Sequence, residues 1–192
     1  MKKKFGKLVI VSAPSGCGKT TVVRQLLRKN KRCIRSVSYT TRPPRSGEKN
    51  GRDYFFISKD EFNAKKRRGF FLETAPVFHY TYGTSKEFVQ QYVARGKYVV
   101  LIIDIQGMKK VCRRVKGKLP LITIFIMPPS IEELGRRLVM RKTERKSELE
   151  CRLKMAKKEM AASSLYQYAV VNQRVSQTVK EIEEILKHEY TH

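Results

Sequence analysis

Short apolar runs alternate along the chain with segments whose apolar residues recur at helical spacing. The runs are almost continuously apolar, which is typical of strands buried on both faces of a sheet. The segments between them carry the three- and four-residue spacing of amphipathic helices. This alternation predicts an α/β fold in which a parallel sheet is flanked by helices. The predicted strands are Leu8–Val11, Ile34–Ser38, Tyr98–Ile103, Leu121–Met127 and Tyr168–Val171.

Several helix starts are indicated by a Ser or Thr that is followed three residues later by Glu. The hydroxyl of such a residue can accept a hydrogen bond from a backbone N–H of the first turn, and the Glu can return one. The pairs are Ser58 with Glu61, Ser130 with Glu133, Ser147 with Glu150, and Thr178 with Glu181.

Two regions interrupt the alternation. Residues 38–84 are rich in Tyr, Phe, Arg and Gly and contain strand-like runs at Tyr54–Phe56 and Phe70–Leu72, which predicts a small, mixed-β insert. The stretch Arg136–Arg152 is basic and has few large apolar residues, most of all over Lys142–Ser147. Because a segment with little to bury moves easily, we expect a mobile helical lid there.

The sequence shows no internal repeat and no interdomain linker, and 192 residues suffice for one domain with a buried core. We therefore expect a single domain over residues 1–192. In this interpretation the core comprises residues 5–37, 85–135 and 166–190, the insert comprises residues 38–84, and the lid comprises residues 136–165.

The segment Ala-Pro-Ser-Gly-Cys-Gly-Lys-Thr follows the first predicted strand and precedes a helix. This order is typical of a phosphate loop, in which backbone N–H groups and the positive end of the helix surround nucleotide phosphates. We expect Lys19 to contact the β- and γ-phosphates of ATP, and Thr20 to ligate Mg²⁺ directly. Ala13 replaces the usual first glycine, but the final Gly-Lys-Thr is intact. The alternative, a glycine-rich turn without a ligand, is disfavoured by the flanking strand and helix. The predicted ATP-binding residues of this phosphate loop are Ala13, Pro14, Ser15, Gly16, Cys17, Gly18, Lys19 and Thr20.

The chain is strongly basic, because 42 Lys and Arg against 17 Asp and Glu give a formal net charge of +25. Such a charge attracts any polyanion, so nonspecific nucleic-acid binding is expected from electrostatics alone. No zinc-finger, aromatic RNA-binding or basic-zipper pattern is present, and we interpret most of the charge as solvated surface. The four cysteines have no C-x-x-C spacing, which indicates no metal site and favours a reduced, cytoplasmic setting. No apolar stretch approaches the roughly 18 residues needed to span a membrane.

The most specific pattern is S-x-T-T-R-x-x-R-x-G-E-x-x-G-x-x-Y-x-F, which begins at Ser38 and ends at Phe56. Phe71-Leu72-Glu73, Tyr82-Gly83-Thr84 and Asp104-Ile105-Gln106-Gly107 follow it in that order. On these residues the chain, from about Lys7 to Ile185, resembles the guanylate kinases, a family of P-loop nucleoside monophosphate kinases. The resemblance implies a P-loop NTPase core. It also implies transfer of the γ-phosphoryl group of ATP to GMP, and to dGMP, in purine nucleotide metabolism, with Mg²⁺ as the cofactor of ATP.

The implied GMP site has one part for the phosphate and one part for the base. Arg42 and Arg45 offer fork-shaped donors to a phosphate that carries about two negative charges, and the resemblance adds the Tyr54 and Tyr82 hydroxyls. Guanine presents two adjacent donors, N1–H and the exocyclic amine, which one carboxylate can accept; the resemblance assigns this role to Glu73. The hydroxyls of Ser38 and Thr84 would bind the rest of the guanine edge. The implied GMP-binding residues are Ser38, Arg42, Arg45, Tyr54, Glu73, Tyr82, Thr84 and Asp104.

Asp104 follows a predicted strand, as an acid that holds Mg²⁺ through water would. Many family members have a second acid two residues earlier, where this chain has Ile102. Asn172 matches a position near the base of ATP, although Gln173 replaces the Asp that follows it in many relatives.

The lid contributes arginines that match the family's transition-state residues. Phosphoryl transfer spreads charge over the equatorial oxygens, so positioning and neutralisation are what the protein supplies. Lys142 stands where many relatives have a glycine. The implied catalytic residues are Lys19, Arg42, Arg137, Arg141 and Arg152.

Three alternatives stay open on the sequence alone. The chain could be a P-loop kinase of another small phosphorylated substrate, a non-catalytic guanylate kinase-like module that binds phosphopeptides, or a nucleic-acid-binding protein. The intact Gly-Lys-Thr disfavours the module, and Glu73 with Ser38 and Thr84 disfavours another substrate. The oligomeric state stays open between monomer and homodimer.

Overall fold

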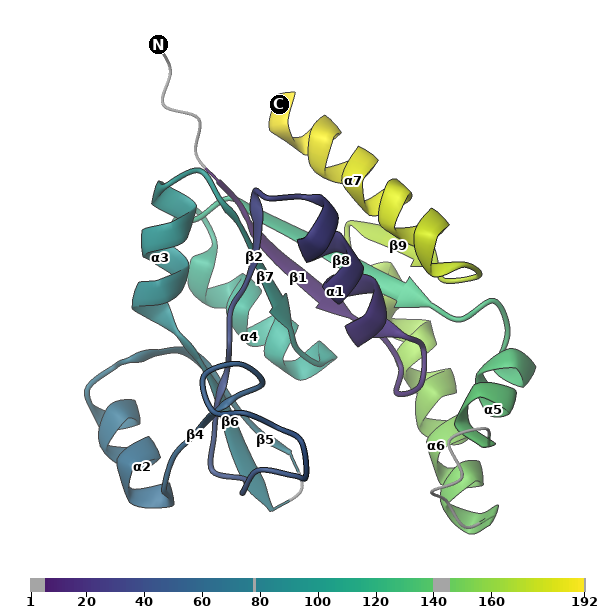
Figure 1. Cartoon of the computed structure of the whole chain (residues 1–192), viewed down its shortest axis with the longest axis horizontal. Helices are drawn as coiled ribbons and strands as arrows, with labels where there is room; N and C mark the ends of the chain where they lie inside the picture. Colours follow the sequence, from purple (N-terminus) through teal and green to yellow (C-terminus); the bar gives the residue numbers. More distant parts are fainter. Residues whose placement is uncertain (1–5, 78, 140–145, 192) are drawn as a thin grey trace. The chain divides into compact units, whose positions relative to one another are not determined.

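The computed structural model describes residues 6–77, 79–139 and 146–191. Within these ranges the chain forms a five-stranded and a four-stranded sheet, with helices between the strands (Figure 1). The five-stranded sheet is parallel, has the order β2-β7-β1-β8-β9 and is flanked by helices, as the alternating apolar runs predict. Its strands are β1 (Leu8–Ser12), β2 (Cys33–Arg35), β7 (Tyr98–Ile102), β8 (Leu121–Met127) and β9 (Tyr168–Val171).

β2 is shorter than predicted, because it ends at Arg35 instead of Ser38. The backbone N–H of Ser36 still donates to the carbonyl oxygen of Val100 at 3.0 Å. Tyr39, however, already pairs with strands of the other sheet. One extended stretch is therefore shared between two sheets, and its composition does not mark the change of partner.

The helices between the strands bury apolar stripes. α1 (Lys19–Lys29) and α7 (Val175–Thr191) pack against each other, with Leu26 of the first and Ile182 of the second fully buried (Figure 1). The remaining helices outside the insert are α3 (Lys86–Ala94), α4 (Ile105–Val115), α5 (Ile131–Val139), α6 (Lys146–Ala161) and the short 3₁₀ helix η1 (Ala162–Leu165). Among the described residues, none of these helices combines the length and apolar character needed to cross a lipid bilayer.

Two of the predicted helix caps are confirmed. Ser58 and Ser130 each accept a hydrogen bond at 3.1 Å from the backbone N–H three residues later. The prediction at Thr178 is wrong: α7 begins at Val175, and Thr178 is a buried residue inside it. Its hydroxyl instead donates to Oδ1 of Asn172 at 3.0 Å, a partner that local spacing does not reveal. Ser147 also lies inside a helix, α6, rather than before it.

Residues 38–85 contain the four-stranded sheet, in the order β4-β3-β6-β5. β3 pairs with β4 in parallel and with β6 antiparallel, so the sheet is mixed, as expected for the insert. The predicted run at Phe70–Leu72 continues as a strand to Val77. The elements of the insert are β3 (Tyr39–Thr40), β4 (Phe55–Phe56), α2 (Lys59–Arg67), β5 (Phe71–Val77) and β6 (Tyr80–Ser85).

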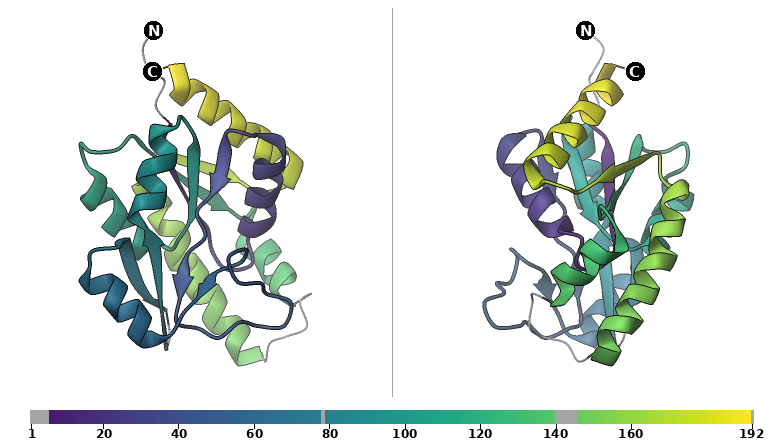
Figure 2. Two further views of the ribbon diagram at one scale, coloured as in Figure 1. Left: turned by 60° about the vertical axis from the view of Figure 1, so that its left-hand side comes forward. Right: turned by 90° about the vertical axis from the view of Figure 1, so that its right-hand side faces the viewer.

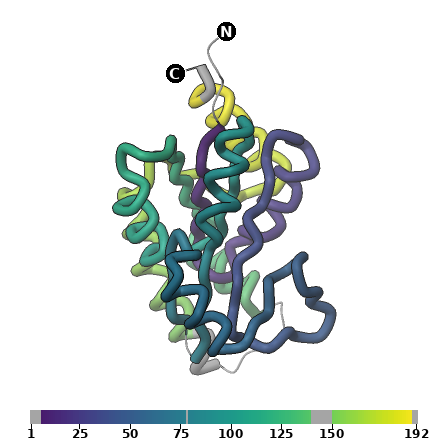
Figure 3. Tube along the Cα trace, turned by 90° about the vertical axis from the view of Figure 1, so that its left-hand side faces the viewer, coloured from purple at the N-terminus to yellow at the C-terminus, as the bar shows by residue number. Residues whose placement is uncertain are grey.

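A long loop, residues 41–54, joins β3 to β4 and projects as the dark-blue excursion in Figure 3. The core of the insert is aromatic: the ring of Phe62 in α2 stacks on that of Phe71 in β5, with centroids 4.5 Å apart. This packing fixes β5, the strand that carries Glu73, against the helix of the insert.

The contacts within the chain divide it into two compact units. The first contains the described residues up to Leu8 together with Ile34–Leu101 and Gln106–Leu121, and thus the whole insert. The second contains Val9–Cys33, Ile102–Ile105 and the described residues from Ile122 on, and thus the phosphate loop and the predicted lid.

The predicted lid, residues 136–165, contains the end of α5 and all of α6, two helices that pack side by side (Figure 2). Leu134, Leu138 and Ala156 are buried, whereas Val139 and Met155 are 59% and 53% exposed. This region thus has both buried and exposed apolar side chains, and its role as a lid stays a prediction. Arg141 and Lys142 lie outside the described residues.

Candidate active site

The phosphate loop leaves β1, turns back and enters α1, as its sequence predicts. Gly16 and Gly18 have positive φ angles of 88° and 84°, a conformation that residues with a Cβ rarely adopt. A Cβ on Gly16 would also lie 2.7 Å from Cδ2 of Leu138. Ala13, in contrast, is buried at 8% exposure, so its methyl group fits where the usual pattern has glycine. The departure at this position is therefore compatible with a formed loop.

The thiol of Cys17, within the phosphate loop, is unreactive. Cys17 is fully buried, and burial raises the pKa of its thiol to about 11. The thiol therefore stays protonated and donates to the carbonyl oxygen of Ile126 at 3.5 Å. This residue anchors the loop to β8 and is no nucleophile, since only a thiolate reacts.

Asn172 holds the phosphate loop from the other side. Its side-chain Nδ2 donates to the carbonyl oxygen of Cys17 at 2.7 Å, and its Oδ1 accepts from Thr178 at 3.0 Å. The residue is 2% exposed. Asn172 was expected near the base of ATP, but both polar groups of its side chain are already engaged within the protein.

Replacing Asn172 by Ala should destabilise the protein and weaken ATP binding. The change removes the amide donor of the Cys17 carbonyl, and loss of a buried partner costs about 1–3 kcal/mol. We expect a lower free energy of unfolding in urea and a higher KM for ATP, with the KM for GMP unchanged. Gln173→Ala, at an exposed neighbour, is the control. An unchanged KM for ATP in the Asn172 variant would show that the loop does not depend on this bond.

Lys19 lies at the start of α1, and its Nζ donates to the carbonyl oxygen of Ala13 at 3.4 Å. Burial lowers the pKa of Lys19 below its ordinary value, and the carboxylates of Glu159 and Asp104 partly offset this effect. The ammonium is thus poorly solvated and attracted by two acids. Such a group is well suited to bind an anionic phosphate, which would replace the missing solvation.

Two acids accompany Lys19 in the second unit. Asp104 follows β7, at whose end the hydroxyl of Ser12 donates to the carbonyl oxygen of Ile103 at 2.7 Å. Glu159, on α6, is half-buried, and burial raises the pKa of its carboxyl above the ordinary value. Asp104 was predicted here as an acid that holds Mg²⁺ through water. Glu159 was not predicted, because nothing in the spacing of α6 distinguishes it from the helix's other charged residues.

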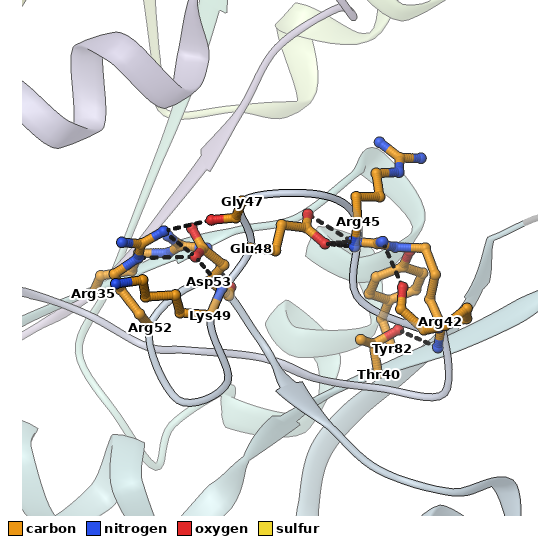
Figure 4. Close-up of polar contacts among 11 residues, drawn as sticks. Arg35, Thr40, Arg42, Arg45, Gly47, Glu48, Lys49, Arg52, Asp53 and Tyr82 are labelled. Atoms are coloured by element: carbon orange, nitrogen blue, oxygen red, sulfur yellow. Dashed lines mark hydrogen bonds and ion pairs between the residues drawn. The ribbon is translucent and has the colours of Figure 1, made fainter.

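The arginine expected to bind the acceptor phosphate is held in a dense cluster in the insert (Figure 4). Arg42 is only 7% exposed. Its Nη2 donates to both carboxylate oxygens of Glu48, at 2.8 and 2.9 Å, and its Nη1 to the carbonyl oxygen of Pro43 at 2.9 Å. Glu48 also accepts from the backbone N–H of Arg45 at 2.8 Å. These hydrogen bonds, that of Arg42 first, hold the pKa of Glu48 below its usual range.

The two tyrosines predicted for the same phosphate lie beside Arg42. Nε of Arg42 donates to the hydroxyl oxygen of Tyr82 at 3.2 Å, and its guanidinium carbon lies 5.4 Å from the centre of the Tyr54 ring. The two tyrosine rings contact each other edge to face, with centroids 5.6 Å apart. Burial raises the pKa of Tyr54, so its hydroxyl remains a donor. The structure thus brings these three predicted residues together.

The side chain of Arg45 points away from the pair that Arg42 forms with Glu48 (Figure 4). Farther along the same loop, Asp53 accepts from the backbone N–H of Lys49 and from Nε of Arg52, both at 2.9 Å. Arg35, in turn, donates to the carbonyl oxygen of Asp53 at 3.0 Å. The loop that carries the two arginines predicted to bind phosphate is therefore held at both of its ends.

Glu73 and Thr84 form a buried pair across β5 and β6. The two residues lie opposite each other in the ladder, and the Thr84 hydroxyl donates to Oε1 of Glu73 at 2.8 Å. Glu73 is 5% exposed and Thr84 fully buried. Because a carboxylate offers acceptors only, this pair suits a ligand edge that carries hydrogen-bond donors. Ser38 lies just before β3 of the same sheet and is half-buried.

The arginines of the predicted lid lie in different environments. Arg137 donates from Nε to Glu133 at 3.0 Å, and from Nη1 to the carbonyl oxygen of Asn172 at 3.2 Å. It is therefore tied to the residue that holds the phosphate loop. Arg152 is exposed on α6, whereas Arg141 lies outside the described residues.

The residues fit a metal that is carried by a nucleotide better than one held by the protein alone. Among the described residues, no group of three or more His, Cys, Asp and Glu side chains could hold an ion. Mg²⁺ commonly takes one or two protein ligands together with phosphate oxygens and waters. Thr20, exposed on the first turn of α1, and Asp104, near Lys19, suit that arrangement.

Comparisons with known proteins agree with this geometry. A family model described as guanylate kinase matches residues 5–189. The chain is 45% identical to the guanylate kinase of Wolbachia sp. subsp. Brugia malayi over 184 residues, or 96% of this chain and 93% of that protein. It is 46% identical to the guanylate kinase of Clostridium tetani over 184 residues, covering 96% and 86% of the two chains.

A solved structure shows the same agreement in three dimensions. The crystal structure of guanylate kinase from Anaplasma phagocytophilum matches with a TM-score of 0.81 and 34% identity, over 99% of this chain and 89% of that one. A shikimate kinase from Bacteroides thetaiotaomicron, at 17% identity and a TM-score of 0.50 over 94% and 98% of the two chains, shares the fold alone. From its phosphate loop to its final helix, the chain belongs to the guanylate kinase family.

Proposed function

We propose that the two sets of residues divide the guanylate kinase reaction between them, with ATP bound at the phosphate loop and GMP at the insert. Members of this family phosphorylate GMP to GDP with ATP, and this chain is such a kinase.

At the phosphate loop, the backbone N–H groups and Lys19 would bind the β- and γ-phosphates of ATP. Lys19 supports this role because it is poorly solvated and close to two acids. Thr20 and Asp104 would hold Mg²⁺, the second of them through water, and the ion would neutralise charge on the β- and γ-phosphates. Asn172 would act on ATP through the loop, since its amide already bonds the Cys17 carbonyl.

At the insert, Arg42, Arg45, Tyr54 and Tyr82 would bind the phosphate of GMP. The dianionic phosphate would compete with Glu48 for the guanidinium of Arg42, which its present partners keep in a fixed orientation. The tyrosines would donate hydrogen bonds without adding positive charge. The nucleophilic phosphate oxygen would therefore keep its negative charge.

The base of GMP would be recognised by Glu73, with Ser38 and Thr84 at the rest of the guanine edge. A buried carboxylate that accepts N1–H and the exocyclic amine rejects adenine, which offers no such donor pair. Asp104 is the remaining proposed contact of GMP. The pairing of buried Glu73 with Thr84 is the single observation that best supports guanine as the base.

During transfer, Arg42 and the lid residues Arg137, Arg141 and Arg152 would neutralise the charge that spreads over the equatorial oxygens. A lid that closes would also exclude water, which would otherwise consume ATP by hydrolysis. The chemistry requires no dedicated general base, and we assign none.

A substrate panel tests this proposal. ADP formation from ATP should depend on GMP or dGMP and be far slower with AMP, UMP, CMP or a sugar phosphate. Faster turnover of one of the other phosphates would identify a P-loop kinase of different specificity. Failure of every acceptor, together with binding of a phosphopeptide, would identify a non-catalytic module.

A further inference from the structure

The strand that carries Glu73 contains one extra residue just before it. In the antiparallel pairing of β5 with β6, Phe71 lies opposite Ser85, but Glu73 lies opposite Thr84. Two steps along β5 thus correspond to one step along β6, which makes Leu72 the extra residue of a β-bulge. Bulges redirect side chains and are frequent next to active sites.

This bulge decides which side chain faces Thr84. With a regular ladder from the pair Phe71–Ser85, Leu72 would lie opposite Thr84, and Glu73 would point to the other face of the sheet. The extra residue instead places Glu73 directly opposite Thr84, where their side chains hydrogen bond at 2.8 Å. The position of the carboxylate therefore depends on the bulge.

The bulge is held by α4. Nη1 of Arg114 donates to the carbonyl oxygens of Phe71 and Leu72, at 2.9 and 2.7 Å. Nζ of Lys110, one helical turn earlier, donates to the carbonyl oxygen of Thr74 at 2.9 Å. Carbonyls on both sides of Glu73 are therefore bonded to two cations from one face of one helix.

Phe71 stacks on Phe62, but the other side of this stretch of β5 has open space beside it. A cavity of about 420 Å³ lies against it, with Phe71, Leu72, Thr74 and Arg114 among its lining residues. The bidentate contact of the Arg114 guanidinium bridges part of this gap with two short hydrogen bonds. Both bonds come from one nitrogen, whose two N–H groups donate to the carbonyls of neighbouring residues.

We propose that Arg114 is a positioning residue for guanine specificity, because it holds the β5 bulge that aims the carboxylate of Glu73 at the base. Arg114 does not touch the substrate; it acts through the backbone of Phe71 and Leu72. This inference rests on the proposed role of Glu73. A recognition group must be held within roughly 0.5 Å of its productive position, so loss of the bidentate contact weakens recognition.

The test compares Arg114→Met, which removes the donors but keeps an unbranched side chain, with the parent. We expect the KM for GMP to rise roughly 10- to 100-fold, as small misplacements of binding groups do. The KM for ATP and kcat at saturating GMP should not change. Arg113→Met is the matched control, because Arg113 is an exposed neighbour that bonds a carbonyl of its own helix.

A purely structural role would not alter the preference among purines, so the second readout is the ratio of kcat/KM for GMP to that for IMP. IMP keeps the N1–H and the O6 of GMP but lacks the exocyclic amine, and the ratio therefore reports how well Glu73 meets that amine. Arg114→Met should lower the ratio, and Arg114→Lys, with a single ammonium, should lower it less.

Combining Arg114→Met with Glu73→Gln separates the positioning role of Arg114 from the proposed role of Glu73 in base recognition. In the Glu73→Gln background, Arg114→Met should leave the ratio unchanged, since the carboxylate that it positions is absent. If Glu73→Gln lowers the ratio and Arg114→Met alters only the melting temperature, the positioning role is refuted. If Glu73→Gln itself leaves the ratio unchanged, the role of Glu73 in base recognition fails instead.

Discussion

Replacing Lys19 by Met should abolish phosphoryl transfer and leave a folded protein. The ammonium is the only charged side chain within the phosphate loop itself, and it would contact oxygens whose charge grows during transfer. Removing one such preorganised donor costs about 10²–10³-fold in rate, and loss of a full charge at this position costs more. We expect kcat to fall at least about 10³-fold, measured as GMP-dependent ADP formation.

The same variant should be no less stable than the parent. Burial lowers the pKa of Lys19, which means that the protonated ammonium is less favourable in the folded protein than in the unfolded chain. That cost is fully present below the folded-state pKa, and it disappears as pH rises above the pKa of the unfolded lysine. At mildly acidic pH the melting temperature of Lys19→Met should therefore equal or exceed that of the parent, and any advantage should shrink at alkaline pH.

Lys29→Met, at an exposed position on the last turn of the same helix, is the matched control and should keep the parent's activity. Substantial residual turnover by Lys19→Met would show that the backbone and the metal suffice for the γ-phosphate. A large drop in its melting temperature would show instead that Lys19 is a structural residue.

Local sequence predicts the elements of this protein well because the strands are nearly uniform apolar runs and the phosphate loop is a compact motif. It fails where a residue's partner is remote. Asn172 bonds a carbonyl 155 residues away, so no local pattern distinguishes a contact with the loop from one with the base of ATP. Thr178 matches a capping box but lies inside α7, where its hydroxyl donates to Asn172.

The insert shows the same limit within a shorter stretch. The pattern that contains Arg42 also contains Glu48, yet nothing in the sequence says that the two side chains form a bidentate pair. That pairing depends on the path of the loop between β3 and β4, which turn residues constrain only loosely. The sequence does not predict the bulge at Leu72 either, since a strand with one extra residue has the same composition as a regular one.

Replacing Glu73 by Gln should greatly weaken the preference for GMP over other purine monophosphates. A carboxylate offers only acceptors, which suits the two adjacent donors of guanine. A carboxamide offers one acceptor and one donor, so its NH₂ group would oppose one of those donors. Loss of a charged hydrogen bond together with an unsatisfied buried group costs about 3–4 kcal/mol, or roughly 10²–10³-fold in kcat/KM for GMP.

The kcat/KM values for the other purine monophosphates should fall less than that for GMP, or rise, because their bases match a carboxamide better than guanine does. Adenine presents an acceptor at N1, which the NH₂ group of the carboxamide can meet, and hypoxanthine presents a donor at N1, which its carbonyl oxygen can meet; neither base carries the 2-amine that would oppose the NH₂ group. We therefore expect the order of kcat/KM to move toward AMP and IMP in Glu73→Gln, measured with the same coupled assay.

Glu48→Gln is the control, because it perturbs the partner of Arg42 in the same insert without touching the proposed base contact. The phosphate is common to all three substrates, so this variant should change the KM values together and leave their ratios alone. If Glu73→Gln likewise changed every KM by the same factor, guanine would be recognised elsewhere, and the buried pair of Glu73 with Thr84 would serve only to hold β5 against β6.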